Sequence, residues 1–165
     1  MYLEQLRSKG LVLGKNVSFQ EGIFIDPSHC YLIAIGDGCT FAPNVRLIAH
    51  DASTKKLVNA TRLGRIRIGA RCFIGDSVLV LPGVTIGDEC IVGAGSVVSR
   101  DIPAGSVAAG NPARVIKSTA EYRKFHAERL AAGRKFGVQF QATTSTPADR
   151  LEVHAALDAG PAYID

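Results

Sequence analysis

Aliphatic residues recur at every sixth position through the middle of the chain. Read in blocks of six, the first position is aliphatic in six successive blocks, at Ile68, Ile74, Val80, Ile86, Val92 and Val98. The second position is often glycine, as at Gly69, Gly75, Gly87 and Gly93. The fifth position is small or β-branched, with Cys72, Val78, Val84, Cys90, Ser96 and Ile102. The same spacing occurs earlier, at Leu13, Phe19 and Ile25 and again at Ile35, Phe41 and Leu47.

A period of six predicts neither a helix, which needs a period near 3.6, nor a simple strand, which needs a period of 2. It is typical of short strands joined by tight turns and stacked as coils, each strand lying about 4.8 Å from the next. Three blocks make one coil, so Cys72 and Cys90, which are 18 positions apart, fall on one face of successive coils. We expect these cysteines to be small buried side chains, and the chain to form an all-β solenoid.

Two breaks interrupt the repeat, and both carry polar residues. The first lies between Ile25 and Ile35, and the second is a longer insertion at 48–66. Insertions in a repeat protein form loops on one face, which is often the binding face. Asp26 and His29 occupy the first break, and His50 and Asp51 begin the second. We therefore expect the two breaks to face each other across a cleft.

The two ends of the chain differ from the repeat. Residues 1–10 have the pattern of a short amphipathic N-terminal helix. Ser118 and Glu121 have the spacing of a capping box, which predicts a C-terminal helix within 118–140. Such a helix would cover the open edge of the last coil in the repeat region 11–117. Residues 141–165 have a weak pattern and are expected to form a loosely ordered or disordered tail.

Composition agrees with a narrow coil, because aromatic residues are only 7%, tryptophan is absent and there are 17 glycines. A net charge of +4 is too small to indicate nucleic acid, and it suits an anionic small ligand equally well. No apolar run is long enough for a transmembrane helix, and the N-terminus lacks the apolar core of a signal peptide. We therefore expect a cytoplasmic protein. The spacing of the four cysteines has no zinc-ligand pattern, so no metal is expected.

Three motifs accompany the repeat: PGVTIG at 82–87, GAGSVV at 93–98 and AAGNPARVI at 108–116. With these motifs the chain closely resembles the left-handed β-helix acyltransferases. It is most similar to the branch that contains maltose and galactoside acetyltransferases and polysaccharide O-acetyltransferases. The resemblance implies a left-handed parallel β-helix of hexapeptide repeats, acetyl-CoA as the acyl donor, and transfer to a hydroxyl of a sugar or polysaccharide precursor. It also implies a homotrimer with active sites shared between subunits.

A sugar hydroxyl is a poor nucleophile, so a base must remove its proton, and histidine has a suitable pKa. The resembled enzymes place a histidine after an Ala-Pro-Asn-Val block, which here is 42–45 and precedes His50. The resemblance thus implies that His50 is the general base, with His29 as a rival. Asp51, or a carboxylate from the other break, is expected to orient the imidazole. No nucleophile with an adjacent base is evident, so direct transfer in a ternary complex is expected. The candidate acceptor-binding residues are Asp26, His29, Asn44 and Asp51.

The resemblance also implies a path for coenzyme A along the later coils. Backbone groups at Gly75, Asp76, Gly93 and Ala94 would bind the pantetheine arm, and the N–H of Asp76 would stabilise the oxyanion. Anionic phosphates need cationic donors, and the guanidinium group suits them well. The candidate phosphate-binding residues are Ser99, Arg100, Arg114 and Lys117.

Other functions stay open at this point. One is N-acetylation of an amino sugar, including a nucleotide-linked one, in which loss of His50 would cost less activity because a neutral amine is already nucleophilic. Another is acetylation of serine or of an antibiotic. A third is a non-catalytic or metal-dependent coil of the carbonic-anhydrase-like type. That type needs three histidines around zinc, whereas the coil region supplies only His29 and His50.

Overall fold

The computed structural model of the chain describes residues 2–164. The chain divides into two compact units, Met1–Thr119 and Ala120–Asp165. The first unit contains the six-residue repeat and both of its breaks. The second contains the C-terminal helices.

Short strands of the first unit form three sheets. The first sheet contains β1 (Val12–Leu13), β4 (Ile33–Ile35), β9 (Ile66–Ile68) and β12 (Thr85–Ile86). The second contains β2 (Ser18–Phe19), β5 (Thr40–Phe41), β10 (Phe73–Ile74), β13 (Ile91–Val92), β15 (Ser106–Gly110) and β16 (Ala113–Ser118). The third contains β3 (Phe24–Ile25), β6 (Arg46–Leu47), β11 (Leu79–Val80) and β14 (Val97–Val98).

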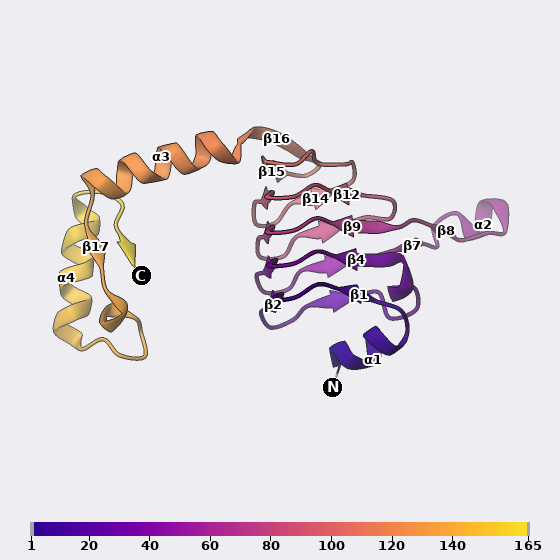
Figure 1. Cartoon of the computed structure of the whole chain (residues 1–165), viewed down its shortest axis with the longest axis horizontal. Helices are drawn as coiled ribbons and strands as arrows, with labels where there is room; N and C mark the ends of the chain where they lie inside the picture. Colours follow the sequence, from indigo (N-terminus) through magenta and orange to yellow (C-terminus); the bar gives the residue numbers. More distant parts are fainter. Residues whose placement is uncertain (1, 165) are drawn as a thin grey trace. The chain divides into compact units, whose positions relative to one another are not determined.

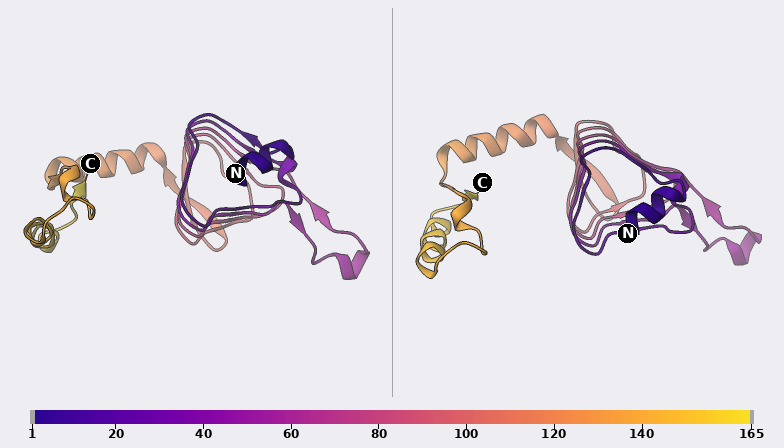
Figure 2. Two further views of the ribbon diagram at one scale, coloured as in Figure 1. Left: turned by 90° about the horizontal axis from the view of Figure 1, so that it is seen from below. Right: turned by 60° about the horizontal axis from the view of Figure 1, so that its bottom comes forward.

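All strand pairs in these three sheets are parallel except β15 with β16, which is antiparallel. Consecutive strands fall on the three sheets in turn, so the chain winds in stacked coils with three sides (Figures 1 and 2). The six-residue period therefore predicts both the strands and their stacking correctly.

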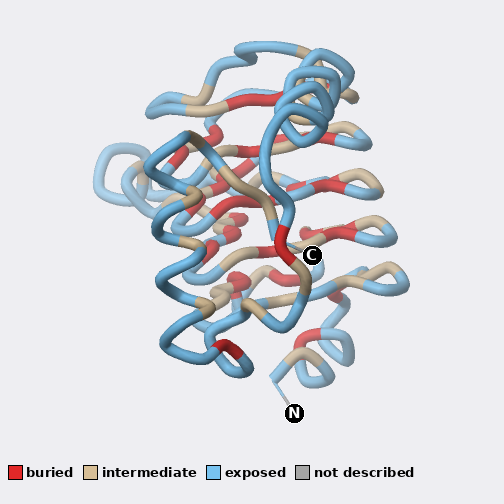
Figure 3. The backbone as a smooth tube through the Cα atoms, turned by 90° about the vertical axis from the view of Figure 1, so that its left-hand side faces the viewer, coloured by how far each residue is buried: buried red, intermediate tan, exposed pale blue. Residues whose placement is uncertain are grey.

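The first and fifth positions of each block fill the interior of the coils. Ile74, Val80, Val92 and Val98 at first positions are fully buried, as is Val78 at a fifth position. Figure 3 shows buried segments recurring from coil to coil. At the N-terminal end, α1 (Tyr2–Ser8) packs the buried side chain of Leu6 against this core.

The cysteines behave as the repeat predicts. Cys39, Cys72 and Cys90 precede paired strands on three successive coils and are at most 2% exposed. The Cys72 thiol donates to the carbonyl oxygen of Gly87 at 3.1 Å. Hydrogen bonds with Cys39 and Cys90, together with burial, raise the pKa of the Cys72 thiol. These thiols are buried core side chains.

Glycine is required where the turns of successive coils stack closely. A Cβ atom on Gly36 would lie 2.7 Å from the carbonyl carbon of Gly69 on the next coil, and one on Gly69 would lie 2.7 Å from that of Gly87. Real Cβ atoms do not approach backbone this closely. The frequent glycine at the second position of the repeat thus lets the corner between the first and second sheets stay narrow.

Both breaks contain local structure of their own. The first holds a 3-10 turn, η1 (Cys30–Leu32). In the second, β7 (His50–Asp51) pairs antiparallel with β8 (Arg62–Leu63), and α2 (Lys55–Val58) lies between them. This hairpin extends away from the coils (Figure 1). The insertion predicted at 48–66 is therefore a hairpin arm.

The second unit contains more order than its sequence pattern suggests. Its elements are α3 (Thr119–Ala132), β17 (Lys135–Phe136), η2 (Val138–Phe140), α4 (Pro147–Asp158) and β18 (Tyr163–Ile164), and β17 pairs with β18. The tail predicted from 141 onward instead includes α4. A capping box between Thr146 and Asp149 with Pro147 in the first turn begins this helix, a signal that the weak apolar pattern obscured.

Within residues 2–164, no helix is both long enough and apolar enough to span a membrane.

Candidate functional site

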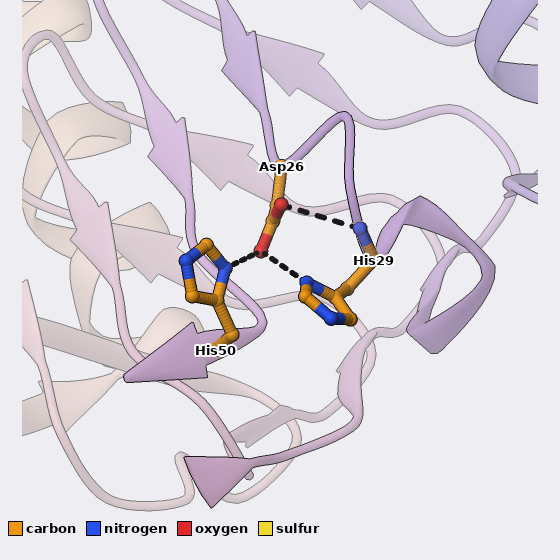
Figure 4. A group of neighbouring side chains, drawn as sticks. All are labelled: Asp26, His29 and His50. Atoms are coloured by element: carbon orange, nitrogen blue, oxygen red, sulfur yellow. Dashed lines mark hydrogen bonds and ion pairs between the residues drawn. The ribbon is translucent and has the colours of Figure 1, made fainter. Parts of the chain in front are cut away.

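The two breaks of the repeat meet at one corner of the coils. Asp26 directly follows β3, and His50 follows β6 after two residues. Because β3 and β6 are neighbours in the third sheet, their following residues lie side by side. His29, three residues after Asp26, completes a cluster with them (Figure 4). The two breaks therefore meet as predicted, but in direct contact and not across a cleft.

Asp26 is a buried carboxylate held by backbone donors. It is 1% exposed. Its Oδ1 accepts hydrogen bonds from the N–H groups of Ser28 at 3.1 Å and His29 at 3.2 Å. Its Oδ2 accepts one from the N–H of Ala49 at 3.2 Å and lies 2.5 Å from Nδ1 of His50. Burial acts to raise the pKa of Asp26, but hydrogen bonds from His50, Ser28 and Ala49 outweigh it, so that the pKa lies below its ordinary value.

The contact with Asp26 sets the proton arrangement of His50. A carboxylate at Nδ1 holds the proton there, so the neutral ring keeps its lone pair on Nε2. The His50 side chain is 36% exposed and therefore accessible. A partly exposed histidine that is oriented by a carboxylate is equipped to accept a proton.

His29 lies beside this pair without a hydrogen bond of its own at Nδ1. Its ring centroid is 4.8 Å from that of His50, with the two planes tilted by 45°. Its Nδ1 lies 3.7 Å from Oδ2 of Asp26, is buried, and has no hydrogen-bond partner within residues 2–164. The side chain as a whole is 24% exposed.

A pocket of about 400 Å³ opens next to His50. Its lining residues are Ile48, His50, Asp51, Ala52, Arg62, Leu81, Pro82 and Ser99. Ser99, a residue predicted to bind phosphate, thus shares a pocket with the predicted base. Arg62 is a pocket residue that the sequence reasoning missed; a cation inside the polar insertion was the available signal.

Asp51 has a different role from the one considered for it. Its Oδ1 accepts a hydrogen bond from the N–H of Ser53 at 2.9 Å, and hydrogen bonds from Ser53 lower its pKa. Asp51 pairs across the hairpin with Arg62, and it lines the pocket. Of the two carboxylates considered as partners of the His50 ring, Asp26 makes the contact.

The candidates for the pantetheine arm lie at another corner. The turn between β10 and β11 contains Gly75 and Asp76, and the turn between β13 and β14 contains Gly93 and Ala94. Asn44 belongs to the same corner, since its Nδ2 donates to Oδ1 of Asp76 at 3.4 Å. The third sheet separates this corner from His50. A single chain therefore does not bring Asn44 or these four residues to the predicted base.

The candidates for the phosphates are also divided. Ser99 and Arg100 follow β14 at the corner of His50, and both are exposed. Arg114 and Lys117 lie on β16 at the edge of the second sheet, and both are exposed. The structure thus groups Ser99 and Arg100 with the base and places the other two apart.

Comparison with known proteins supports this architecture. Residues 65–100 match the family described as bacterial transferase hexapeptide (six repeats). YvoF of Bacillus subtilis, provisionally named an acetyltransferase, is 33% identical over 124 residues, which cover 75% of this chain and 68% of YvoF. Galactoside O-acetyltransferase of Escherichia coli is 44% identical over 90 residues. That match covers 53% of this chain and 44% of the enzyme, so the chain spans less than half of its length.

Two solved structures have similar folds. A maltose O-acetyltransferase from Clostridium difficile 630 has a TM-score of 0.54 and 33% identity, over 68% of this chain and 72% of that one. A galactoside acetyltransferase in complex with coenzyme A has a TM-score of 0.55 and 30% identity, over 72% and 70% of the two chains. From its repeat, its stacked parallel strands and these relatives, the chain belongs to the family of hexapeptide-repeat acetyltransferases.

Proposed function

We propose that the protein is an acetyl-CoA-dependent O-acetyltransferase that acts on a hydroxyl of a sugar or polysaccharide precursor. The observation that carries this proposal is the pair of His50 and Asp26, with the His50 side chain partly exposed and lining a pocket. Relatives named for galactoside and maltose O-acetylation support the acceptor class. A similar structure that holds coenzyme A supports the donor. The coil is proposed to be left-handed, as the family resemblance implies.

In the proposed reaction, Nε2 of His50 accepts the proton of the acceptor hydroxyl as its oxygen attacks the thioester carbonyl carbon. Asp26 keeps the proton on Nδ1 and stabilises the imidazolium that forms. The carbon–sulfur bond then breaks, and the imidazolium returns its proton to the departing thiolate. The products are an acetyl ester and free coenzyme A, and His50 is regenerated without an acyl-enzyme.

A hydroxyl acceptor fits this arrangement better than an amine. A neutral amine already has a nucleophilic lone pair, whereas a hydroxyl must lose its proton as it attacks. A buried carboxylate that fixes the tautomer of His50 serves the second case most directly. The hydroxyl acceptor is therefore the preferred assignment.

The separation of the two corners supports a shared site. His50 lies at one end of the third sheet, and Asp76 with Gly93 lies at the other. In a homotrimer, the base corner of one subunit would face the pantetheine corner of its neighbour. The backbone N–H of Asp76 would then be supplied to the oxyanion from the adjacent subunit, and Arg100 would meet the phosphates.

The proposal is tested by coenzyme A binding and by transfer. Calorimetry measures coenzyme A affinity, and release of free thiol measures transfer to galactosides, maltose, nucleotide-sugars, amino sugars and serine. We expect coenzyme A to bind and a sugar hydroxyl to be acetylated. For a variant at His50, His154→Gln is the matched control, because His154 lies exposed on α4. No binding of coenzyme A would contradict the class, and faster transfer to an amine would contradict the acceptor.

A further inference from the structure

Asp26, His29 and His50 also form a set of potential metal ligands. Each offers one ligand atom, and the three atoms lie within 4.8 Å of one another. Two imidazole nitrogens and one carboxylate oxygen suit Zn²⁺ and related divalent transition ions. We infer that this corner binds a divalent transition metal, best represented by Zn²⁺, and that the bound ion switches off His50 as a base. The second part of this inference rests on the proposed function, whereas the first does not.

The observed distances lie on either side of those that zinc requires. With bonds of about 2.0–2.1 Å in a tetrahedron, neighbouring ligand atoms are about 3.3 Å apart. Oδ2 of Asp26 lies 2.5 Å from Nδ1 of His50 and 3.7 Å from Nδ1 of His29. Each of these two pairs therefore needs a shift of less than about 1 Å, and the ion replaces the proton between His50 and Asp26.

The ligands differ in freedom in a way that favours such a site. Asp26 is fixed by three backbone N–H donors, which leave its Oδ2 aimed at both rings. The two imidazoles are partly exposed, so they can rotate and an ion can enter. A ligand held in place by hydrogen bonds from neighbouring groups is typical of metal sites in proteins.

The unpartnered nitrogen of His29 is the second observation. Buried polar atoms are usually satisfied, yet Nδ1 of His29 has no hydrogen-bond partner within residues 2–164. It faces the carboxylate that His50 contacts, as Figure 4 shows. A cation between the three side chains would satisfy this nitrogen and the carboxylate at once.

Metal binding has a defined consequence for His50. If Nδ1 coordinates the ion, the neutral ring carries its proton on Nε2 and has no lone pair there. The metal-bound ring cannot accept the proton of an acceptor hydroxyl. The bound ion is therefore inhibitory, and the proton on Nδ1 and the metal ion compete for the same position. The expectation of no metal rested on the cysteine spacing and on a site of three histidines, whereas this set combines two histidines and an aspartate from two separate breaks.

The test uses Co²⁺ as a spectroscopic probe and Zn²⁺ by calorimetry, with the full chain freed of metal by a chelator. We expect one Co²⁺ per chain, with visible ligand-field bands. His29→Gln and Asp26→Asn should each weaken binding by at least about 10-fold, whereas His154→Gln should not change it. Circular dichroism checks the fold of each variant, and His29→Gln keeps the test valid if the Asp26 variant does not fold.

The inhibitory part is measured on transfer of the acetyl group. We expect Zn²⁺ to inhibit with the same midpoint as its binding, and a chelator to restore the rate. In His29→Gln, inhibition relative to its own metal-free rate should need at least about 10-fold more Zn²⁺. No Co²⁺ binding, or binding equal in the wild type and both ligand variants, overturns the site. Binding without inhibition overturns the switch. If the protein binds the metal but shows no acetyl transfer after the metal has been removed, only the proposed function is overturned.

Discussion

Replacing Asp26 by Asn removes the charge from the buried partner of His50 while keeping its shape. The amide has one acceptor oxygen, but the carboxylate accepts from donors on both sides. If the amide oxygen takes the place of Oδ1, it keeps the N–H groups of Ser28 and His29, and the amide NH₂ meets Ala49 and His50. The reverse orientation would leave the N–H groups of Ser28 and His29 unsatisfied, whereas the first leaves only that of Ala49. The first orientation is therefore expected.

This orientation changes the tautomer of His50. With an NH₂ group opposite, Nδ1 must become an acceptor, so the proton moves to Nε2 and the base is lost. General-base catalysis contributes about 10²–10⁴-fold, so we expect kcat to fall by about that factor with little change in KM. The unsatisfied N–H of Ala49 and the lost charge-assisted bond should together lower the free energy of unfolding by about 2–4 kcal/mol.

Steady-state transfer kinetics and urea denaturation measure these two effects. Asp158→Asn is the matched control, because Asp158 is exposed on α4 and is not part of the candidate site. We expect this control to retain kcat within a few-fold and to leave stability almost unchanged. If Asp26→Asn retained wild-type kcat, or if Asp158→Asn lost as much, Asp26 would not be the residue that orients the base.

Three further predictions concern stability. Gly36→Ala places a Cβ 2.7 Å from the carbonyl carbon of Gly69 and should lower the free energy of unfolding in urea by about 2–3 kcal/mol. The control Gly95→Ala meets no atom within 4 Å and should lower it by about 1 kcal/mol through its φ of 68°. Equal losses would argue against tight stacking of the corners. The pKa of Asp26 is lower in the folded than in the unfolded protein, so its contribution to the free energy of unfolding is complete above the unfolded pKa of about 4. That contribution is lost as the pH falls below this value and through the folded pKa. The stability gap between wild type and Asp26→Asn should then shrink below about pH 4, and a constant gap would contradict this. Thr146→Ala removes the capping box of α4 and should reduce hydrogen-exchange protection there by about 1 kcal/mol, and unchanged protection would show that the cap adds nothing.

The sequence predicts the coil well because the repeat is tied directly to burial. An aliphatic residue such as Ile74 or Val80 at the first position must face the interior, and a spacing of 18 then aligns Cys72 with Cys90. The breaks are visible as departures from the same rule. The presence of polar residues in both of them was enough to predict that they meet.

The six-residue repeat did not predict the conformation of the chain within the two breaks. The repeat does not determine how an irregular segment bends, so it could not choose between Asp26 and Asp51 as the partner of His50. Arg62 enters the pocket only because the hairpin folds back on β7. Asn44 lies in the turn after β5, at a different corner from His50 within one chain, so its role at the acceptor stays a prediction. The order in α4 depends on a cap, which a weak apolar pattern concealed.

The proposed role of His50 as the base of acetyl transfer is tested by the transfer rate of His50→Ala at saturating donor and acceptor, with coenzyme A affinity measured on the same sample. We expect a rate lower by about 10²–10⁴-fold with nearly unchanged coenzyme A affinity. Transfer by His50→Ala at the wild-type rate would contradict this role.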